Sequence, residues 1–414
     1  MSLSTDTLPL SETVTPDNQR ELALRVREAQ ADSTAIYPLG GETSLDFGLV
    51  PRTPGVGLST SALDRVIDYP VRDMTITVES GITMAALGER LATENQRLPI
   101  DVPRPRQATL GGVVATNFSG PRRYGCGTIR DYVIGITAVD GRGMTFRGGG
   151  QVVKNVAGYD FCKLLTGSLG TLGVITQITL KIRPQPEASA FVACKIADFD
   201  QAERCLAQLV TSPVTPTAIQ WLAGPSWSDD PALPHMAGEG AGYLVIGLEG
   251  TRVEVDWMAK ELAADWNPGG GLPVERVAED QVSGLWQRFS EFPASGESPL
   301  VLKASILPSS TGQMIGLLRA FDPQCSILAH AGSGIVLARL STFKAEDASR
   351  ELIGRWHPFA RRAGGHLIML SADPGLGLTR AAVWGGSTEA WEAMRAVKEQ
   401  FDPQGLLNPG RFIF

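Results

Sequence analysis

Short runs of alternating apolar and polar residues dominate the first half of the chain, and two stretches with helical periodicity interrupt them. The clearest alternation is MTITVES (residues 74–80), in which every second residue is apolar, as in a half-buried strand. Helices are predicted at about 15–30, where Thr15 is a suitable N-cap and Pro16 a suitable first residue, and at 84–95. This order of short elements, without a long βαβ repeat, predicts an α+β fold. The strands predicted in this half cover residues 35–37, 57–60, 75–78, 131–139, 144–147 and 174–182.

The pattern changes after about residue 188, where glycine becomes rarer and longer strand-like and helical runs alternate. This change predicts a second, α/β domain, and Pro184 and Pro186 mark the boundary. The predicted organisation is a first domain at 1–187, a cap domain at 188–395 and a C-terminal return to the first domain at 396–414. The elements predicted here are strands at 191–196, 242–248, 300–307 and 335–340 and helices at 200–209, 253–265 and 391–401.

Length and composition agree with two globular domains, because 414 residues exceed what one hydrophobic core usually supports. The hydrophobic fraction of 43% and the charged fraction of 20% are ordinary, and the net charge of −7 argues against nucleic acid as the main partner. No run of eighteen apolar residues predicts a transmembrane segment, and the N-terminus lacks the features of a signal peptide. These features predict a cytoplasmic protein.

Cysteine and histidine are too dispersed to predict a metal centre. The five cysteines form no C-x-x-C pair, which suits a reducing compartment and excludes a cysteine-rich iron–sulfur or zinc site within this chain. The four histidines form no H-x-x-x-H pair. We therefore expect no metal.

The stretch IYPLGGETSLDFG (residues 36–48) places two adjacent glycines after a short apolar run. A hairpin turn is one interpretation, because Gly-Gly supplies the positive φ that tight turns need. The other is an anion nest, in which backbone N–H groups converge on a phosphate. The stretch alone leaves both open.

Two further glycine loops bear on that choice: TLGGVVATNFSG (residues 109–120) and GSLGTLG (residues 167–173). Taken alone, Thr109 is equally suited to cap a helix, and the third loop to end one. No G-x-G-x-x-G, P-loop or G-x-S-x-G motif is present, which removes Rossmann-type nicotinamide binding, phosphoryl transfer and the hydrolase elbow.

Together and in this order, the three loops resemble the FAD-binding domain of the vanillyl-alcohol oxidase family, also called PCMH-type. The resemblance covers roughly residues 20–187, and the closing FDPQGLLNPGR resembles that family's return to the flavin. The run VVKNVAGYDFCKLLTGSLGTLGVIT is similar to the FAD-binding subunits of bacterial glycolate oxidases. The resemblance implies a two-domain PCMH-type fold with an α/β cap.

The resemblance also implies which residues hold FAD. The first loop would wrap the pyrophosphate, where Gly40 and Gly41 would let the backbone approach, and Glu42 would turn to solvent or to a ribose hydroxyl. The second loop would lie against the isoalloxazine ring, and the third would line the adenosine and pyrophosphate. The implied FAD-binding residues are Leu39, Gly40, Gly41, Glu42, Thr43, Ser44, Leu45, Pro103, Thr109, Gly111, Gly112, Ala115, Thr116, Gly120, Gly125, Asp160, Gly170, Gly173, Val174 and Ile175.

Two departures from the family pattern concern catalysis. Catalytic relatives often have Glu where this chain has Leu169, and their cap motif H-x-G-D-G-N-x-H reads HAGSGIVL at residues 330–337 here. The sequence thus identifies no catalytic residue. His330 is expected to be a structural residue near the domain interface, although a role as a catalytic base stays open. For Arg288 two interpretations stay open: it binds a carboxylate of the substrate, or it lies on a helix beside a buried Trp286.

The resemblance implies FAD-dependent oxidation of glycolate to glyoxylate, with this chain as an FAD-binding subunit accessory to a catalytic flavoprotein paralogue and accompanied by an iron–sulfur subunit. Association with the inner membrane through that complex stays open. FAD is expected to be non-covalent, because the first domain contains no histidine, and Cys126 is interpreted as a plain buried thiol rather than a flavin attachment. Two alternatives stay open: a self-sufficient 2-hydroxy-acid dehydrogenase, and a non-catalytic flavin-bound scaffold or electron carrier.

Overall fold

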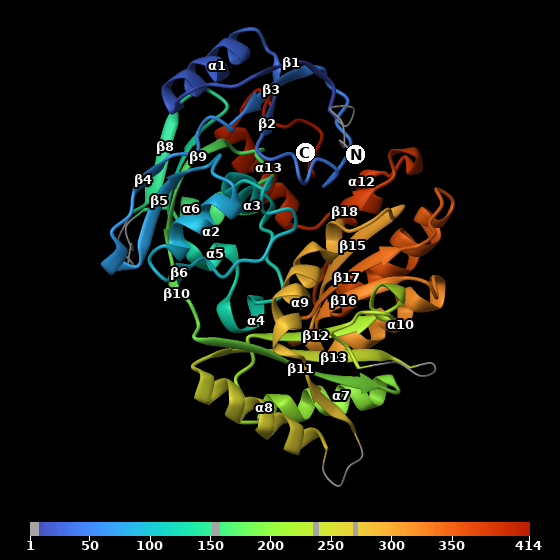
Figure 1. Ribbon diagram of the computed structural model, residues 1–414. Coiled ribbons are helices and arrows are strands. Elements are labelled where there is room, and N and C mark those ends of the chain that lie inside the picture. Colours follow the sequence, from blue (N-terminus) through green and yellow to red (C-terminus); the bar gives the residue numbers. More distant parts are fainter. Residues whose placement is uncertain (1–7, 151–157, 235–239, 268–271) are drawn as a thin grey trace. The chain divides into compact units, whose positions relative to one another are not determined.

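The computed structural model describes residues 8–150, 158–234, 240–267 and 272–414, which divide into two compact units (Figure 1). The first unit comprises the described residues up to Ser119 together with Thr128–Gln185 and Gly386–Phe414. The second comprises Gly120–Gly127 and Pro186–Gly385. The sequence prediction drew boundaries at 187 and 396 and did not separate Gly120–Gly127 from the first domain.

A small parallel sheet opens the first unit. Its strands β1 (Leu10–Val14), β2 (Ala35–Leu39) and β3 (Gly55–Ser59) lie in the order β1-β3-β2, with helix α1 (Gln19–Ala31) between β1 and β2 in sequence. Because β2 and β3 pair in parallel, the hairpin interpretation of Gly40-Gly41 is wrong.

The start predicted for α1 is also wrong. The helix begins at Gln19, because the side chain of Asn18, not Thr15, accepts the hydrogen bond from the Glu21 amide. Strand β1 was not predicted, since its middle residues are polar and exposed and give no apolar alternation.

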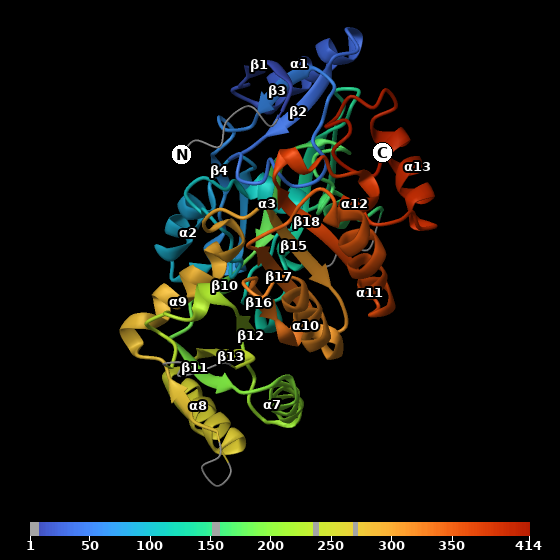
Figure 2. The same cartoon turned by 90° about the vertical axis from the view of Figure 1, so that its right-hand side faces the viewer.

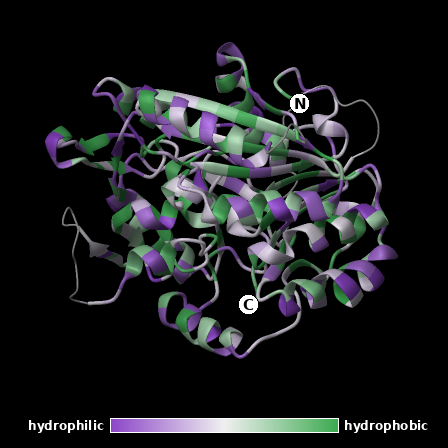
Figure 3. Ribbon diagram, turned by 90° about the horizontal axis from the view of Figure 1, so that it is seen from below, coloured by the Kyte–Doolittle hydropathy of each residue, from purple (hydrophilic) through white to green (hydrophobic). Residues whose placement is uncertain are grey.

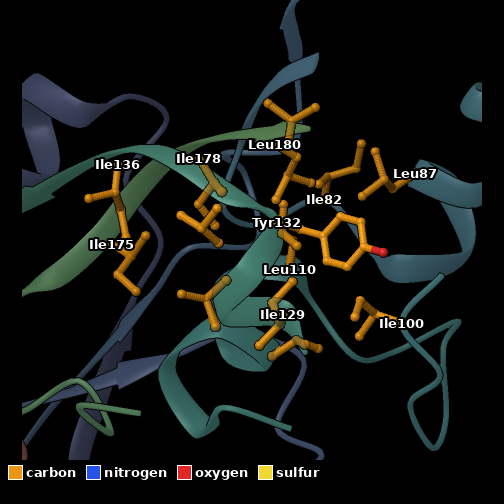
Figure 4. Close-up of a cluster of buried hydrophobic side chains, with 14 of the residues drawn as sticks. Ile82, Leu87, Ile100, Leu110, Ile129, Tyr132, Ile136, Ile175, Ile178 and Leu180 are labelled. Atoms are coloured by element: carbon orange, nitrogen blue, oxygen red, sulfur yellow. The ribbon is translucent and has the colours of Figure 1, made fainter. Parts of the chain in front are cut away.

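A five-stranded antiparallel sheet carries the main core of the first unit. Its order is β4-β5-β9-β7-β8, and helices α2, α3, α5 and α6 contribute side chains to the same buried cluster. Figure 4 shows Ile175, Ile178 and Leu180 of β9 meeting Leu110 of α3 and Tyr132 of α5. The elements are β4 (Val66–Asp68), β5 (Thr75–Glu79), α2 (Met84–Ala92), β6 (Gln96–Arg97), α3 (Leu110–Thr116), α5 (Ile129–Tyr132), β7 (Val133–Val139), β8 (Thr145–Gly149), α6 (Phe161–Leu165), β9 (Val174–Lys181), β10 (Arg183–Pro184) and α13 (Ala390–Phe401).

The second unit is built on an eight-stranded sheet in the order β14-β11-β13-β12-β16-β17-β15-β18. One face packs against α9, whose Leu285, Trp286 and Phe289 join a buried aromatic cluster. Helices α7, α8 and α10 contact the sheet, and α7 also contacts the other two helices (Figure 2). The elements are α4 (Arg123–Cys126), β11 (Ala188–Ile196), α7 (Phe199–Thr211), β12 (Ala218–Ala223), β13 (Gly242–Gly250), α8 (Arg252–Trp266), β14 (Val274–Arg276), α9 (Glu279–Glu291), β15 (Leu300–Ser305), α10 (Thr311–Phe321), β16 (Ser326–His330), β17 (Ile335–Leu340), a π-helix (Ala348–Trp356), α11 (His357–Arg362), β18 (His366–Ala372) and α12 (Arg380–Trp384).

Apolar residues are concentrated in the sheets, whereas the helices carry polar turns on their outer sides (Figure 3). Among the described residues, none of the helices has both the length and the apolar character needed to cross a bilayer.

Candidate functional site

The first two glycine loops pack directly against each other within the first unit. A Cβ atom on Gly40 would lie 2.3 Å from Oγ1 of Thr109, and one on Gly41 would lie 1.7 Å from the carbonyl oxygen of Gln107. Thr109 also caps α3 by accepting the Gly112 amide, as the helix-cap interpretation predicted. The two glycines are therefore required for the approach of one loop to the other, whatever they do for a ligand.

The third loop joins the same cluster. The Leu169 amide donates to the Ala115 carbonyl at 2.9 Å, and a Cβ on Gly170 would lie 3.2 Å from Pro38. Loops that are up to 130 residues apart in sequence (about 40 to about 170) thus meet in one place. Part of the glycolate-oxidase-like run, residues 152–157, lies outside the described residues.

The C-terminal tail binds both the third loop and the strand before the first. The side-chain amide of Asn408 donates to the Leu169 carbonyl at 2.6 Å, and its backbone amide donates to Ile36 at 2.7 Å. Lys398 donates to the Thr171 and Leu407 carbonyls and to the Asp402 carboxylate. The tail therefore links the third loop to strand β2, which leads into the first loop.

Several non-glycine residues of this cluster have left-handed backbone conformations. Glu42, Asn117, Leu169 and Asn408 have φ values of 54°, 53°, 54° and 49°. Such conformations are unfavourable for residues with a Cβ, above all for leucine, and they concentrate at ligand sites. Successive amides around left-handed residues also form concave anion nests.

Among the buried polar atoms of this unit that have no hydrogen-bond partner within the described residues, three belong to the loops and the tail: Oδ1 of Asn117, Oγ of Ser168 and Nε of Arg411. Buried polar atoms are normally paired, so each of them indicates a missing partner. A dinucleotide supplies such partners, since it carries amide and hydroxyl donors and an anionic diphosphate. The loop cluster therefore fits FAD.

The predicted FAD-binding residues fall into three groups: residues in the loop cluster, residues elsewhere in the first unit, and residues in the second unit. Leu39–Leu45, Thr109, Gly111, Gly112, Ala115, Thr116 and Gly170 lie in the cluster, and the Glu42 side chain is exposed, as expected. Val174 and Ile175 are buried in the β9 ladder, which Gly173 precedes, while Asp160 caps α6 and pairs with Lys163 at 2.7 Å. Pro103 is half-buried before the left-handed Arg104.

Gly120 and Gly125 lie in the second unit instead. There the Gly125 amide donates to the Thr217 carbonyl at 3.0 Å, and Arg122 forms an ion pair with Glu249 at 2.9 Å. Cys126 is buried in the same segment. A Cβ on Gly125 would lie 2.7 Å from Cα of Thr217, so packing in the second unit requires this glycine, and a role of Gly120 and Gly125 in FAD binding stays a prediction.

Strand register gathers polar groups on one face of the second sheet. Directly paired neighbours across β12, β16, β17, β15 and β18 are Gln220, His330, Ile335, Ser305 and His366. In the next row, Lys303 lies opposite Leu337. Residues 330, 335 and 337 of the cap motif thus share one face, where the family's Asn and second His are Ile335 and Leu337.

His330 and Lys303 are ionisable groups of this face that lack a complete set of partners among the described residues. His330 is 1% exposed, its Nδ1 donates to Oε1 of Gln220 at 2.6 Å, and its Nε2 has no partner among the described residues. Burial, with Arg123 and Lys303 nearby, lowers the pKa of His330 to about 3, so the ring is neutral at pH 7.

Lys303 is half-buried and makes no hydrogen bond or ion pair in the described part of the chain. Burial first, and then Arg123, lower its pKa to about 8, so most of it is charged at pH 7. Nothing in the sequence pattern singled out Lys303, because its position opposite Leu337 depends on pairing between distant strands.

The guanidinium group of Arg288 is already paired with a carboxylate of the protein. Its Nε and Nη2 donate to the two carboxylate oxygens of Asp230 at 2.6 and 2.9 Å, and Asp230 is almost fully buried. Trp286 on the same helix is buried. Bidentate binding of a carboxylate and a buried tryptophan are therefore both present, but the carboxylate belongs to the protein itself. No group of three or more metal-ligating side chains occurs among the described residues.

Comparisons with known proteins agree with this site. Residues 11–149 match the family described as FAD binding domain, and residues 185–412 match the FAD linked oxidases, C-terminal domain. Glycolate oxidase subunit GlcE of Escherichia coli (strain K12) is 30% identical, over 95% of this chain and 97% of that protein. Glycolate oxidase subunit GlcD of Bacillus subtilis is 25% identical, over 97% and 88% of the two chains.

The solved structure of p-cresol methylhydroxylase with substrate bound has a TM-score of 0.72 at 15% identity, over 98% of this chain and 90% of that one, and supports the fold alone. Together with the loop cluster, these matches lead to one conclusion. The chain is an FAD-dependent oxidoreductase that belongs to the FAD-linked oxidase family and has its PCMH-type two-domain fold.

Proposed function

We propose that this chain is the FAD-binding subunit of an assembly that oxidises glycolate to glyoxylate. The observation that carries the substrate class is Lys303, a half-buried cation without a partner among the described residues. Buried cations are normally paired, and a small 2-hydroxy acid brings a carboxylate of matching charge. The full-length similarity to two glycolate oxidase subunits, one of them 30% identical, supports glycolate as the substrate and a multi-subunit assembly.

FAD is held in this proposal by the first loop at its diphosphate and by the second and third loops, with Asn117 and Ser168 as added polar contacts. When bound, the flavin supplies the capacity to accept two electrons from the substrate as a hydride. The chain itself contributes the loop amides, the C-terminal tail that fixes the loops, and the cation that orients an anion.

An accessory role is supported by the low pKa of His330, which makes this histidine a weak proton acceptor on the Lys303 face. Oxidation of an alcohol requires a group that takes the hydroxyl proton, and a base works best with a pKa near the working pH. His330 has a pKa near 3, and its neighbours in the motif are Ile335 and Leu337. We therefore propose that a catalytic flavoprotein paralogue supplies this chemistry and that an iron–sulfur subunit carries the electrons away.

We assign the assembly to the cytoplasm, with any membrane association made through its partners. Five free, buried cysteines in the described residues are in keeping with a reducing compartment.

One observation favours a second candidate, a self-sufficient 2-hydroxy-acid dehydrogenase. The Nε2 lone pair of His330 is unpartnered and lies in the same cluster as Lys303, which is an arrangement that a carboxylate and a hydroxyl of one small substrate would satisfy. The two candidate functions differ in whether glycolate oxidation depends on His330.

The accessory role predicts that His330→Ala leaves glycolate turnover by the assembly within about threefold of wild type, because a general base contributes about 10²–10⁴-fold and this histidine is not one. Turnover is measured after confirming FAD content and assembly, with His366→Ala on the same sheet face as the matched control. A hundredfold loss specific to His330→Ala would establish the dehydrogenase candidate instead.

Non-covalent FAD predicts that acid precipitation of the purified protein releases all of its flavin into the supernatant. The described part of the first unit contains no histidine, and the one cysteine in it, Cys162, is buried with its thiol pKa raised to about 11 by burial and by Asp160, so it is a poor nucleophile. Absorbance at flavin wavelengths in supernatant and pellet measures the outcome. Yellow colour retained in the pellet would contradict non-covalent binding.

A further inference from the structure

Arg411, in the closing NPGRF stretch, is a buried cation without a partner. Its side chain is 5% exposed, and it makes no hydrogen bond or ion pair within the described residues. Arginine is almost never buried unless paired, because leaving an uncompensated charge inside a protein costs several kcal/mol. Desolvation outweighs the nearby Asp46 and Tyr37 and lowers the Arg411 pKa to about 10, so the residue stays charged at neutral pH.

The backbone places Arg411 at the root of the first glycine loop. On one flank of that loop, the Ile36 carbonyl accepts the Asn408 amide at 2.7 Å, and the Ile36 amide donates to Leu406 at 2.8 Å. On the other flank, the Leu49 amide donates to the Arg411 carbonyl at 3.1 Å. The segment that carries Arg411 thus ties both ends of the loop together.

The loop itself supplies no positive charge. Residues Leu39–Leu45 contain neutral side chains and Glu42, whose charge has the same sign as a diphosphate. Lys398, the other buried cation of the tail, is already paired with Asp402. A dianionic diphosphate therefore needs a counter-charge from elsewhere, and Arg411 is a cation at this loop that has no other partner within the described part of the chain.

We propose that Arg411 is the cation that neutralises the diphosphate of the bound FAD. Guanidinium groups bind phosphate oxygens bidentately, and the burial of this one strengthens the interaction relative to a surface contact. The same role explains why the protein tolerates an unpaired charge there: the bound dinucleotide supplies the missing partner.

The test measures ligand affinity on apoprotein by flavin fluorescence, so it does not depend on turnover. Arg411→Gln is expected to weaken FAD binding about a hundredfold and to weaken competition by ADP in parallel, since both ligands carry the diphosphate. Riboflavin, which lacks phosphate, is expected to bind both proteins equally. Arg411→Lys keeps the charge and is expected to recover most of the affinity. Arg25→Gln, which breaks a surface ion pair with Glu28 on α1, serves as the control without effect.

Thermal melting of the apoproteins separates this role from a structural one. Removing an unpaired buried charge removes no bond, so the Arg411→Gln apoprotein is expected to melt no lower than wild type. Three outcomes would overturn the proposal: FAD affinity within threefold of wild type, an equal loss of riboflavin binding, or an apoprotein that melts clearly below wild type.

Discussion

Gly41→Asp is expected to lower the affinity for FAD by about a thousandfold or more. Two effects add. Like unit charges about 4 Å apart repel by roughly 4 kcal/mol at an effective dielectric of about 20, which alone is about a thousandfold in affinity. In addition, any Cβ at this position would lie 1.7 Å from the Gln107 carbonyl oxygen, so the first two loops must move apart.

Two matched variants separate these effects in the same fluorescence titration. Gly41→Ala adds the Cβ without the charge and is expected to lose less affinity than Gly41→Asp, which isolates the cost of parting the loops. Gly88→Asp adds the same charge on α2, where no heavy atom lies within 4 Å of the new Cβ, and is expected to bind FAD like wild type. A loss below tenfold in Gly41→Asp would mean that the loop does not hold the diphosphate.

Lys398→Met is expected to destabilise the apoprotein by about 3–5 kcal/mol, because it leaves the Asp402 carboxylate buried without its cation. It also removes the bonds from Nζ to Thr171 at 2.8 Å and to Leu407 at 3.0 Å, which attach the tail to the third glycine loop. The free energy of unfolding from urea titration of the apoprotein, followed by circular dichroism, measures the loss.

The double variant Lys398→Met with Asp402→Asn is the control. Removing both charges avoids an unpaired buried ion. The Asn side-chain oxygen still accepts one of the two amides, of Leu406 and Leu407, that bond to the two carboxylate oxygens of Asp402 in the wild type. The double variant is therefore expected to regain more than half of the lost stability. Equal stability of Lys398→Met and wild type would show that the tail is not held by this lysine.

The three glycine loops and the α+β fold were predictable because their signals are local. Each loop is a short glycine-rich run, and alternation such as that of β5 or β9 reports burial without knowledge of the rest of the fold. The role of the glycines was only half predictable. Gly41 was expected to make room for phosphates, which stays a prediction, whereas the structure shows that it makes room for the Gln107 backbone.

Residues whose significance arises from distant pairing were not predictable. Lys303 stands out because strand register sets it opposite Leu337, and Arg411 because the tail returns to the loop root with no counter-ion. The surroundings of Gly125 were not predictable for the same reason. Its segment carries the glycine-rich signature of a ligand loop, yet it packs on Thr217 in the second unit, and no local pattern reports that choice.

Anaerobic addition of glycolate tests the central claim most directly. The assembly purified with its partners, and this chain purified alone with FAD bound, are each mixed with glycolate while flavin absorbance is followed. The account predicts that the flavin of the assembly bleaches and that the flavin of the isolated chain does not. Bleaching of the isolated chain would contradict the accessory role, and an assembly that stays yellow with glycolate would contradict glycolate as its substrate.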